Sequence, residues 1–185
     1  MAVMALATVS SFAQHRVGTV TIQPKVGLSL ANVTKGDGDI RVGAVAGAEF
    51  EYQVSDIFSL SAGALYSMQG CKGEVEGYDA TVKLDYLNIP ILANVYVAKG
   101  LAVKLGIQPG FNVTSKASVE KSGTKVTTDL DGIESVDFSI PIGLSYEINN
   151  FVIDGRYNLG VSKIMDGSDS KNSVFQFTLG YKFAL

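Results

Sequence analysis

The sequence is poor in the residues that build chemical sites. Its 185 residues include one cysteine, Cys71, one histidine, His15, and no tryptophan. A single cysteine excludes a disulfide within the chain and a cysteine-rich zinc site. A metal would have to be held by carboxylates alone, and neither Cys71 nor His15 has a suitable partner nearby in the sequence, so both are interpreted as incidental. We therefore predict no catalytic residues, no metal site and no cofactor.

Charge of one sign and long apolar runs are also missing. The 15 basic and 18 acidic residues give a net charge of −3, and no lysine or arginine cluster indicates a nucleic-acid partner. No run of 18 or more apolar residues occurs, so no transmembrane helix is predicted. A hydrophobic content of 46% nevertheless argues against a disordered chain. Such a chain can still cross a membrane as a closed β-barrel, because closure satisfies every backbone group.

The first residues are typical of the end of a secretory signal peptide. A short apolar run is followed by small residues, with Ser11 and Ala13 at the −3 and −1 positions of a cleavage site. Because no charged segment precedes the run, residues 1–13 are interpreted as a remnant of the leader and residues 14–185 as a single domain. An apolar first strand or helix is the alternative interpretation.

Apolar residues alternate with small or polar ones along the chain, which is the period of a β-strand. Between Leu101 and Thr114 every large apolar residue has an odd number, and the even positions are small or polar. Lys83 and Asp85 break the pattern on the apolar face of their segment, and we place both beyond the hydrocarbon zone. The predicted strands are 20–32, 40–53, 57–70, 81–97, 101–114, 136–148, 151–162 and 174–183.

The connections alternate between tight turns and longer polar stretches. Turns fall at 54–56, 98–100 and 149–150, and longer stretches near 33–39, 71–80, 115–134 and 166–172. This is the layout of a bacterial outer-membrane barrel. We predict an all-β, eight-stranded antiparallel up-and-down transmembrane β-barrel, surrounded by outer-membrane lipid, with both termini in the periplasm.

Alternation alone does not say which face meets lipid. A soluble or periplasmic lipocalin-like barrel would point its apolar face inward and bind a hydrophobic ligand, and this is the alternative. Charges of both signs on the polar face, and aromatic residues near strand ends on the apolar face, favour a lipid-facing apolar surface. An eight-stranded lumen is just filled by side chains, so its charges are expected to pair and close it. The predicted lumen charge network is Lys25, Arg41, Glu49, Glu51, Lys104, Glu147, Asp154, Arg156 and Lys182.

Four short motifs in order along the chain resemble a known family. They are Asp85–Pro90 (DYLNIP), Gly106–Gly110 (GIQPG), Gly155–Gly160 (GRYNLG) and Gly180–Phe183 (GYKF). These resemble the outer-membrane β-barrel domain family common in Bacteroidetes, called PorT-like. The resemblance implies an eight-stranded barrel in the outer membrane and carries over no catalytic residues. Such barrels usually end on an aromatic residue, whereas Ala184 and Leu185 follow Phe183 here.

Two groups of carboxylates have a chemical interpretation beside a plain one. Glu49 and Glu51 share a strand face and suggest an acid/base pair, but a charge cluster neutralised across the lumen is favoured. The loop oxygens suggest Ca²⁺ ligands, but their spacing does not match an EF-hand and solvated loop charge is favoured. The loop carboxylates concerned are Asp129, Asp131, Glu134, Asp166 and Asp169.

The predicted function is a non-enzymatic, monomeric integral barrel with an envelope-structural or surface-interaction role. Any protein or surface partner is expected at the extracellular loops 71–80, 115–134 and 166–172, because loops on a rigid scaffold commonly carry binding function. Two short alternating runs flank Ser122-Gly123. They predict a β-hairpin that extends strands five and six beyond the membrane and presents a sheet edge. A mobile polar loop without a partner is the alternative.

Overall fold

The computed structural model describes residues 15–34, 39–75, 78–121, 124–130, 132–164 and 170–185. The predicted signal-peptide remnant and the loop residues Asp131, Asp166 and Asp169 lie outside this part of the chain. The strands are β1 (Val20–Val33), β2 (Asp39–Ser55), β3 (Phe58–Val75), β4 (Tyr78–Asn88), β5 (Ile91–Ala98), β6 (Leu101–Lys121), β7 (Thr124–Asp129), β8 (Val136–Ile148), β9 (Phe151–Gly160), β10 (Asn172–Tyr181) and β11 (Phe183–Ala184). Within the described residues, no helix has the length and apolar character needed to span a bilayer.

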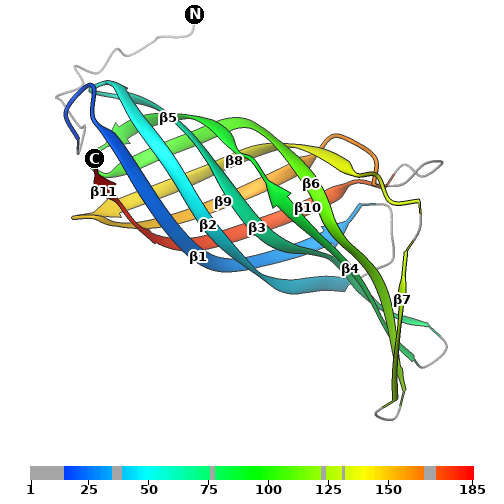
Figure 1. Cartoon of the computed structure of the whole chain (residues 1–185). Coiled ribbons are helices and arrows are strands. Elements are labelled where there is room, and N and C mark those ends of the chain that lie inside the picture. The colour runs from blue at the N-terminus through cyan, green and yellow to red at the C-terminus, as the bar shows by residue number, and fades with distance from the viewer. Residues whose placement is uncertain (1–14, 35–38, 76–77, 122–123, 131, 165–169) are drawn as a thin grey trace, which may run out of the picture.

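The strands form a closed antiparallel barrel, as Figure 1 shows. Each barrel strand pairs with the next along the chain, and β1 pairs with β10 from Lys25–Gly180 to Val33–Asn172. β4 and β5 are one strand interrupted at Ile89-Pro90, and β10 and β11 are one strand interrupted at Lys182. The described residues therefore give eight barrel strands with β7 outside the ring, which confirms the predicted architecture.

The barrel has an apolar outside and a polar inside. On β6, Leu105 and Ile107 are 54% and 57% exposed, whereas Lys104, which directly precedes Leu105, is 3% exposed. Successive side chains of a strand point to opposite faces, and the buried residues of the barrel strands are mostly polar or charged, whereas the large exposed ones are apolar. The lipocalin-like alternative, with its apolar face inward, is therefore wrong.

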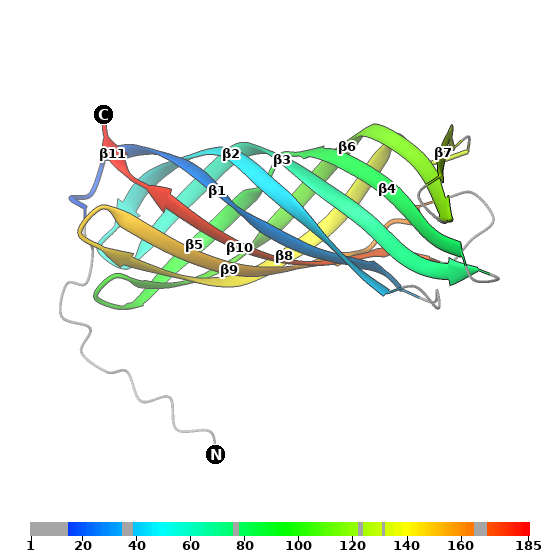
Figure 2. The same ribbon diagram turned by 90° about the horizontal axis from the view of Figure 1, so that it is seen from below.

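Tight turns close one end of the barrel, which we call the turn end. Asn149 has a φ of 58° in the two-residue turn between β8 and β9, a left-handed conformation that asparagine adopts more readily than most residues. The amide of Leu185 donates to the carbonyl of Val20 at 2.9 Å, so the C-terminus lies at this end. The opposite end, the loop end, carries the longer connections (Figure 2).

Two of the predicted loops are largely strand. β3 continues to Val75 and β4 starts at Tyr78, so the predicted loop at 71–80 is mostly a paired hairpin. β6 continues to Lys121 and pairs with β7 from Lys116–Asp129 to Lys121–Thr124, which confirms the predicted hairpin at 115–134. One detail differs, because the return strand β7 ends at Asp129 and is not continuous with β8.

The sequence placed Asp85 beyond the hydrocarbon zone, but the structure shows that it is a buried and paired residue of the barrel. Its side chain is buried, with Oδ1 at 3.2 Å from Arg41 Nη1 and Oδ2 accepting a hydrogen bond from the Tyr66 hydroxyl at 3.0 Å. The pairing of β4 with β6 shifts register between Asp85 and Tyr86, and such an irregularity re-aims side chains. Lys83, by contrast, is half-exposed.

Candidate functional site

The predicted charged residues meet in the lumen as two groups. The first, which we call the central cluster, consists of Lys25 on β1, Glu49 on β2, Lys104 on β6, and Asp154 and Arg156 on β9. Arg156 lies 2.9 Å from each of the two carboxylates. Lys25 Nζ is 2.7 Å from Glu49 Oε2, and Lys104 Nζ is 2.8 Å from Asp154 Oδ2. Three cations from β1, β6 and β9 thus share two carboxylates from β2 and β9.

The second group, the turn-end cluster, consists of His15, Glu51, Tyr96, Glu147 and Lys182. Lys182 Nζ lies 2.9 Å from both Glu51 Oε2 and Glu147 Oε2. The Tyr96 hydroxyl donates to Glu51 and accepts from Lys182 at 3.1 Å. His15 Nε2 lies 3.0 Å from Glu147 Oε1, so the chain before β1 reaches into the turn end of the lumen.

The charges of the two clusters balance. The central cluster has one more cation than carboxylates, and the turn-end cluster has one more carboxylate than lysines, so four carboxylates face four Lys and Arg side chains. All eight residues are at most 5% exposed. An unpaired charge at this depth would be strongly unfavourable, so the balance is what allows these groups to be buried together.

Arg41 is the one predicted network residue outside both clusters, because it pairs with Asp85 toward the loop end. Glu49 and Glu51 share a strand face as predicted, but each contacts its own cation, Arg156 or Lys182, instead of sharing a proton. The geometry is that of a neutralised charge cluster. Among the described residues, no group of three or more His, Cys, Asp or Glu side chains is arranged to hold a metal ion.

Sequence reasoning missed two members of the turn-end cluster. His15 was interpreted as incidental, with no suitable partner nearby in the sequence, and the structure places it in contact with the distant Glu147. These residues are 132 positions apart, and no local pattern links them. Tyr96 could have been found, because it lies on the opposite parity from Ile91, Val95 and Val97, the lipid-facing residues of its strand.

An apolar cap closes the loop end of the lumen. Leu84 and Tyr86 on β4 are each 1% exposed and pack with Ile164, which comes from the connection between β9 and β10. The amide of Glu134 donates to the carbonyl of Ile164 at 2.9 Å, which ties the two long connections together. The cap and the two clusters therefore obstruct the lumen at three levels.

A four-stranded sheet projects beyond the barrel at the loop end, and Figure 1 shows it with β7 outermost. The projecting sheet consists of residues 71–75 of β3, 78–83 of β4, 116–121 of β6 and 124–129 of β7. Val126 pairs with Val119, Val119 with Ala80, and Ala80 with Gly73, so one row of small and apolar residues crosses all four strands. Val126 is 62% exposed and Val119 is 41% exposed.

The other face of the projecting sheet is polar. The hydroxyls of Ser118 and Thr127 lie 3.0 Å apart across β6 and β7. Lys116 pairs with Lys83 across β6 and β4, and its Nζ lies 3.8 Å from Asp129 Oδ1. In the described residues β7 pairs with β6 alone, so its outer edge presents unpaired backbone groups.

Comparison with solved structures finds the same fold. Ail, the attachment invasion locus protein of Yersinia pestis, is 19% identical, with 91% of this chain and 100% of that chain covered at a TM-score of 0.52. Neisserial surface protein A is 17% identical, with coverage of 89% and 97% and a TM-score of 0.56. At these identities the likeness shows the fold alone. A search of curated protein sequences finds no match.

The sequence itself identifies the family. Residues 12–166 match the family described as outer membrane protein beta-barrel domain. This match covers most of the chain and agrees with the closed barrel and its apolar outer surface. The chain belongs to this outer-membrane β-barrel family and is an integral barrel of the bacterial outer membrane, in contact with its lipid.

Proposed function

We propose that this protein is a non-enzymatic barrel that presents the projecting sheet outside the cell as a surface for binding another polypeptide. In bacterial outer-membrane barrels the short turns face the periplasm and the long connections face outward. The projecting sheet is then extracellular. The single observation that carries the proposal is the free edge of β7 beside the exposed Val126.

An open strand edge can accept a further strand. Its outward N–H and C=O groups offer hydrogen bonds to any extended chain, and neighbouring side chains supply the selectivity. Here Val126 and Val119 form an apolar row that runs across the strands, and a side chain on the added strand would extend this row. We infer that a partner segment would place a β-branched or apolar residue opposite Val126.

A catalytic role in the lumen has less support. Acyl-transfer chemistry pairs a nucleophile with a general base, commonly serine with histidine. The ring of His15 instead faces Glu147, a carboxylate that Lys182 also contacts. The charged side chains of the lumen form ion pairs with one another, and this supports a structural role for the network.

The proposal can be tested with a phage-displayed peptide library selected on the protein in detergent. Enriched peptides should alternate β-branched and polar residues. Their binding should be lost with Val126→Asp, which disrupts the apolar row. The matched control is Thr127→Asp, which places the same charge on the polar face of the same strand and should leave binding unchanged. Equal effects of both substitutions, or no enrichment, would contradict the proposal.

A sulfated polysaccharide is a second candidate ligand. Lys83 and Lys116 lie directly opposite each other on β4 and β6, and like charges in that arrangement are destabilising unless an anion or a carboxylate screens them. The structure of Ail, which shares the fold, was solved with the heparin analogue sucrose octasulfate. Retention on immobilised heparin that is lost with Lys83→Gln and Lys116→Gln would support this candidate.

We further propose the finer assignments that the sequence suggested. Residues 14–185 form one domain that follows a cleaved leader, the barrel is a monomer in the membrane, and its relatives are the PorT-like barrels of Bacteroidetes. The four ordered motifs support the last point. Mass spectrometry of the mature protein, with an N-terminus at Gln14, would test the leader.

A further inference from the structure

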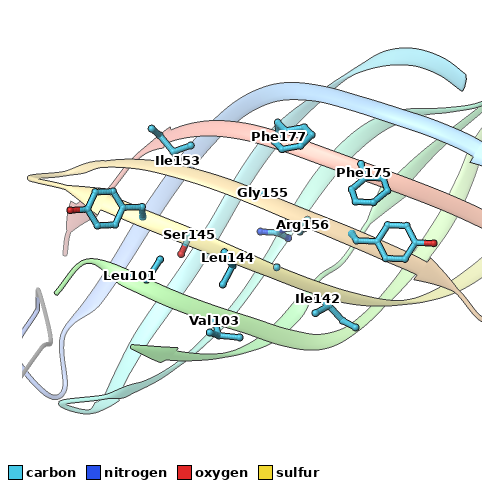
Figure 3. A pocket seen from close by; sticks show the side chains of 13 residues that line it. Leu101, Val103, Ile142, Leu144, Ser145, Ile153, Gly155, Arg156, Phe175 and Phe177 are labelled. Atoms are coloured by element: carbon cyan, nitrogen blue, oxygen red, sulfur yellow. The ribbon is translucent and has the colours of Figure 1, made fainter. Parts of the chain in front are cut away.

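A groove interrupts the lipid-facing surface of the barrel on β6, β8, β9 and β10. It has a volume of about 610 Å³, and Figure 3 shows its lining. Gly155 lies at its centre on the outward face of β9. Leu144 and Phe177 flank Gly155 in the same cross-strand row, and Ile153 and Tyr157 flank it along the strand. At Gly155 the otherwise bulky apolar layer has no side chain, and this absence opens the middle of the groove.

The groove lies between two groups of aromatic rings. Toward the turn end, Phe151 and Tyr181 have ring centroids 5.0 Å apart. Toward the loop end, Tyr157 and Phe175 have centroids 4.5 Å apart. Aromatic residues form girdles at the two interfaces of an outer-membrane barrel, and the band between them faces hydrocarbon. Gly155 is thus at the depth of the lipid acyl chains.

We propose that this groove holds one acyl chain of an outer-membrane lipid in a fixed position. The face is already in contact with lipid, so the groove continues an established interface. An unfilled gap would lose the dispersion contacts of its walls, and a flexible hydrocarbon chain can restore them. A second barrel has no hydrophobic drive to approach this face from lipid, because the acyl chains around it are as apolar as the face itself.

Substitution at Gly155 gives a way to fill the groove without damaging the barrel. A Cβ placed on Gly155 would lie 3.5 Å from the Phe177 ring, which is ordinary van der Waals contact. Gly155→Leu adds an apolar side chain on the lipid face, and Gly155→Ala adds a smaller one. Both variants should fold, and heat-modifiable mobility on gels checks this for each.

The chain contains no tryptophan, so a single introduced tryptophan is the only source of indole fluorescence. Phe177→Trp places an indole on the wall of the groove, and its emission is measured in phosphatidylcholine vesicles that contain increasing fractions of lipid brominated at mid-chain. Quenching needs a bromine close to the ring, so a retained chain lowers the brominated fraction needed for half-quenching. We expect that fraction to rise when Gly155→Leu is added, because the leucine side chain then takes the place of the retained chain beside the indole. Gly155→Ala should give a smaller rise.

The matched control adds Ala64→Leu to the same reporter, because Ala64 is an exposed lipid-facing residue on β3, on another side of the barrel. This control should not shift the quenching curve. Identical curves for all the variants, or an equal shift from Ala64→Leu, would overturn the proposal. So would an indole that brominated lipid does not quench while cross-linking joins two barrels through this face, because the occupant would then be a second copy.

Discussion

Replacing Lys182 by methionine tests whether the lumen charges are held by mutual neutralisation. Lys182 is 3% exposed and lies 2.9 Å from a carboxylate oxygen of both Glu51 and Glu147. At an effective dielectric constant of about 20, each such contact corresponds to about 6 kcal/mol of Coulomb energy before desolvation is subtracted. Methionine keeps most of the side-chain volume, so the change removes charge with little change in packing.

The expected loss of unfolding free energy follows from the two carboxylates that remain buried. Glu51 and Glu147 stay buried without their lysine, and breaking a buried ion pair from one side costs about 3–5 kcal/mol of unfolding free energy. The assay is urea titration of the barrel in lipid vesicles, followed by the gel shift between folded and unfolded forms. Lys99→Met is the control, because Lys99 lies exposed in the turn between β5 and β6 and should change stability little.

A rescue variant separates lost neutralisation from lost packing. Lys182→Met combined with Glu51→Gln removes one cation and one carboxylate, so three carboxylates still face three Lys and Arg side chains, and the amide oxygen can still accept the hydrogen bonds of Ser59 and Tyr96. This double variant should recover part of the lost stability. A loss below about 1 kcal/mol for Lys182→Met, or no recovery in the double variant, would refute the argument from charge balance.

Three further predictions follow from the closed lumen and the projecting sheet. The protein in planar bilayers should show no steady conductance of porin size, because the two clusters and the apolar cap obstruct the lumen, and a stable open channel would contradict this. A membrane-impermeant maleimide should label Cys71 on intact cells, slowly at neutral pH and faster as the pH rises, because burial raises the pKa of the Cys71 thiol and only the thiolate reacts. Labelling that requires spheroplasts would show an inverted topology. Trypsin should cleave intact cells slowly after Lys121 and Lys125, whose backbones are paired in β6 and β7, and rapid cleavage would indicate a mobile loop.

The architecture could be predicted because it depends on a local period. The alternation in residues 101–114 is set by which face of one strand meets lipid, and this can be read within a single segment. The same parity places Glu49, Asp154 and Arg156 in the lumen. It does not say which of them touch, because contact across the barrel depends on the stagger between strands that are far apart in sequence.

The prediction was weakest where the backbone, not side-chain burial, determines the structure. Residues 71–80 are polar and resemble a loop, yet residues 71–75 and 78–80 form strand because β4 lies between two partners, β3 and β6, that satisfy its backbone groups. Asp85 escaped prediction for a related reason, since its burial depends on a register shift and on Arg41 from another strand. Neither cause leaves a period in the sequence.

The projecting sheet changes how a binding surface on this barrel should be understood. A flexible loop loses conformational entropy when a partner orders it, at roughly 1–2 kcal/mol per residue. Three of the four strands of the projecting sheet are continuous with barrel strands, so their backbones are already ordered before any partner arrives. β7 in turn is held by six paired positions on β6, from Lys116–Asp129 to Lys121–Thr124. When a strand is added to the β7 edge, most of the conformational entropy lost is therefore that of the added strand itself. A smaller entropic cost on the side of the barrel allows a short edge to support specific binding.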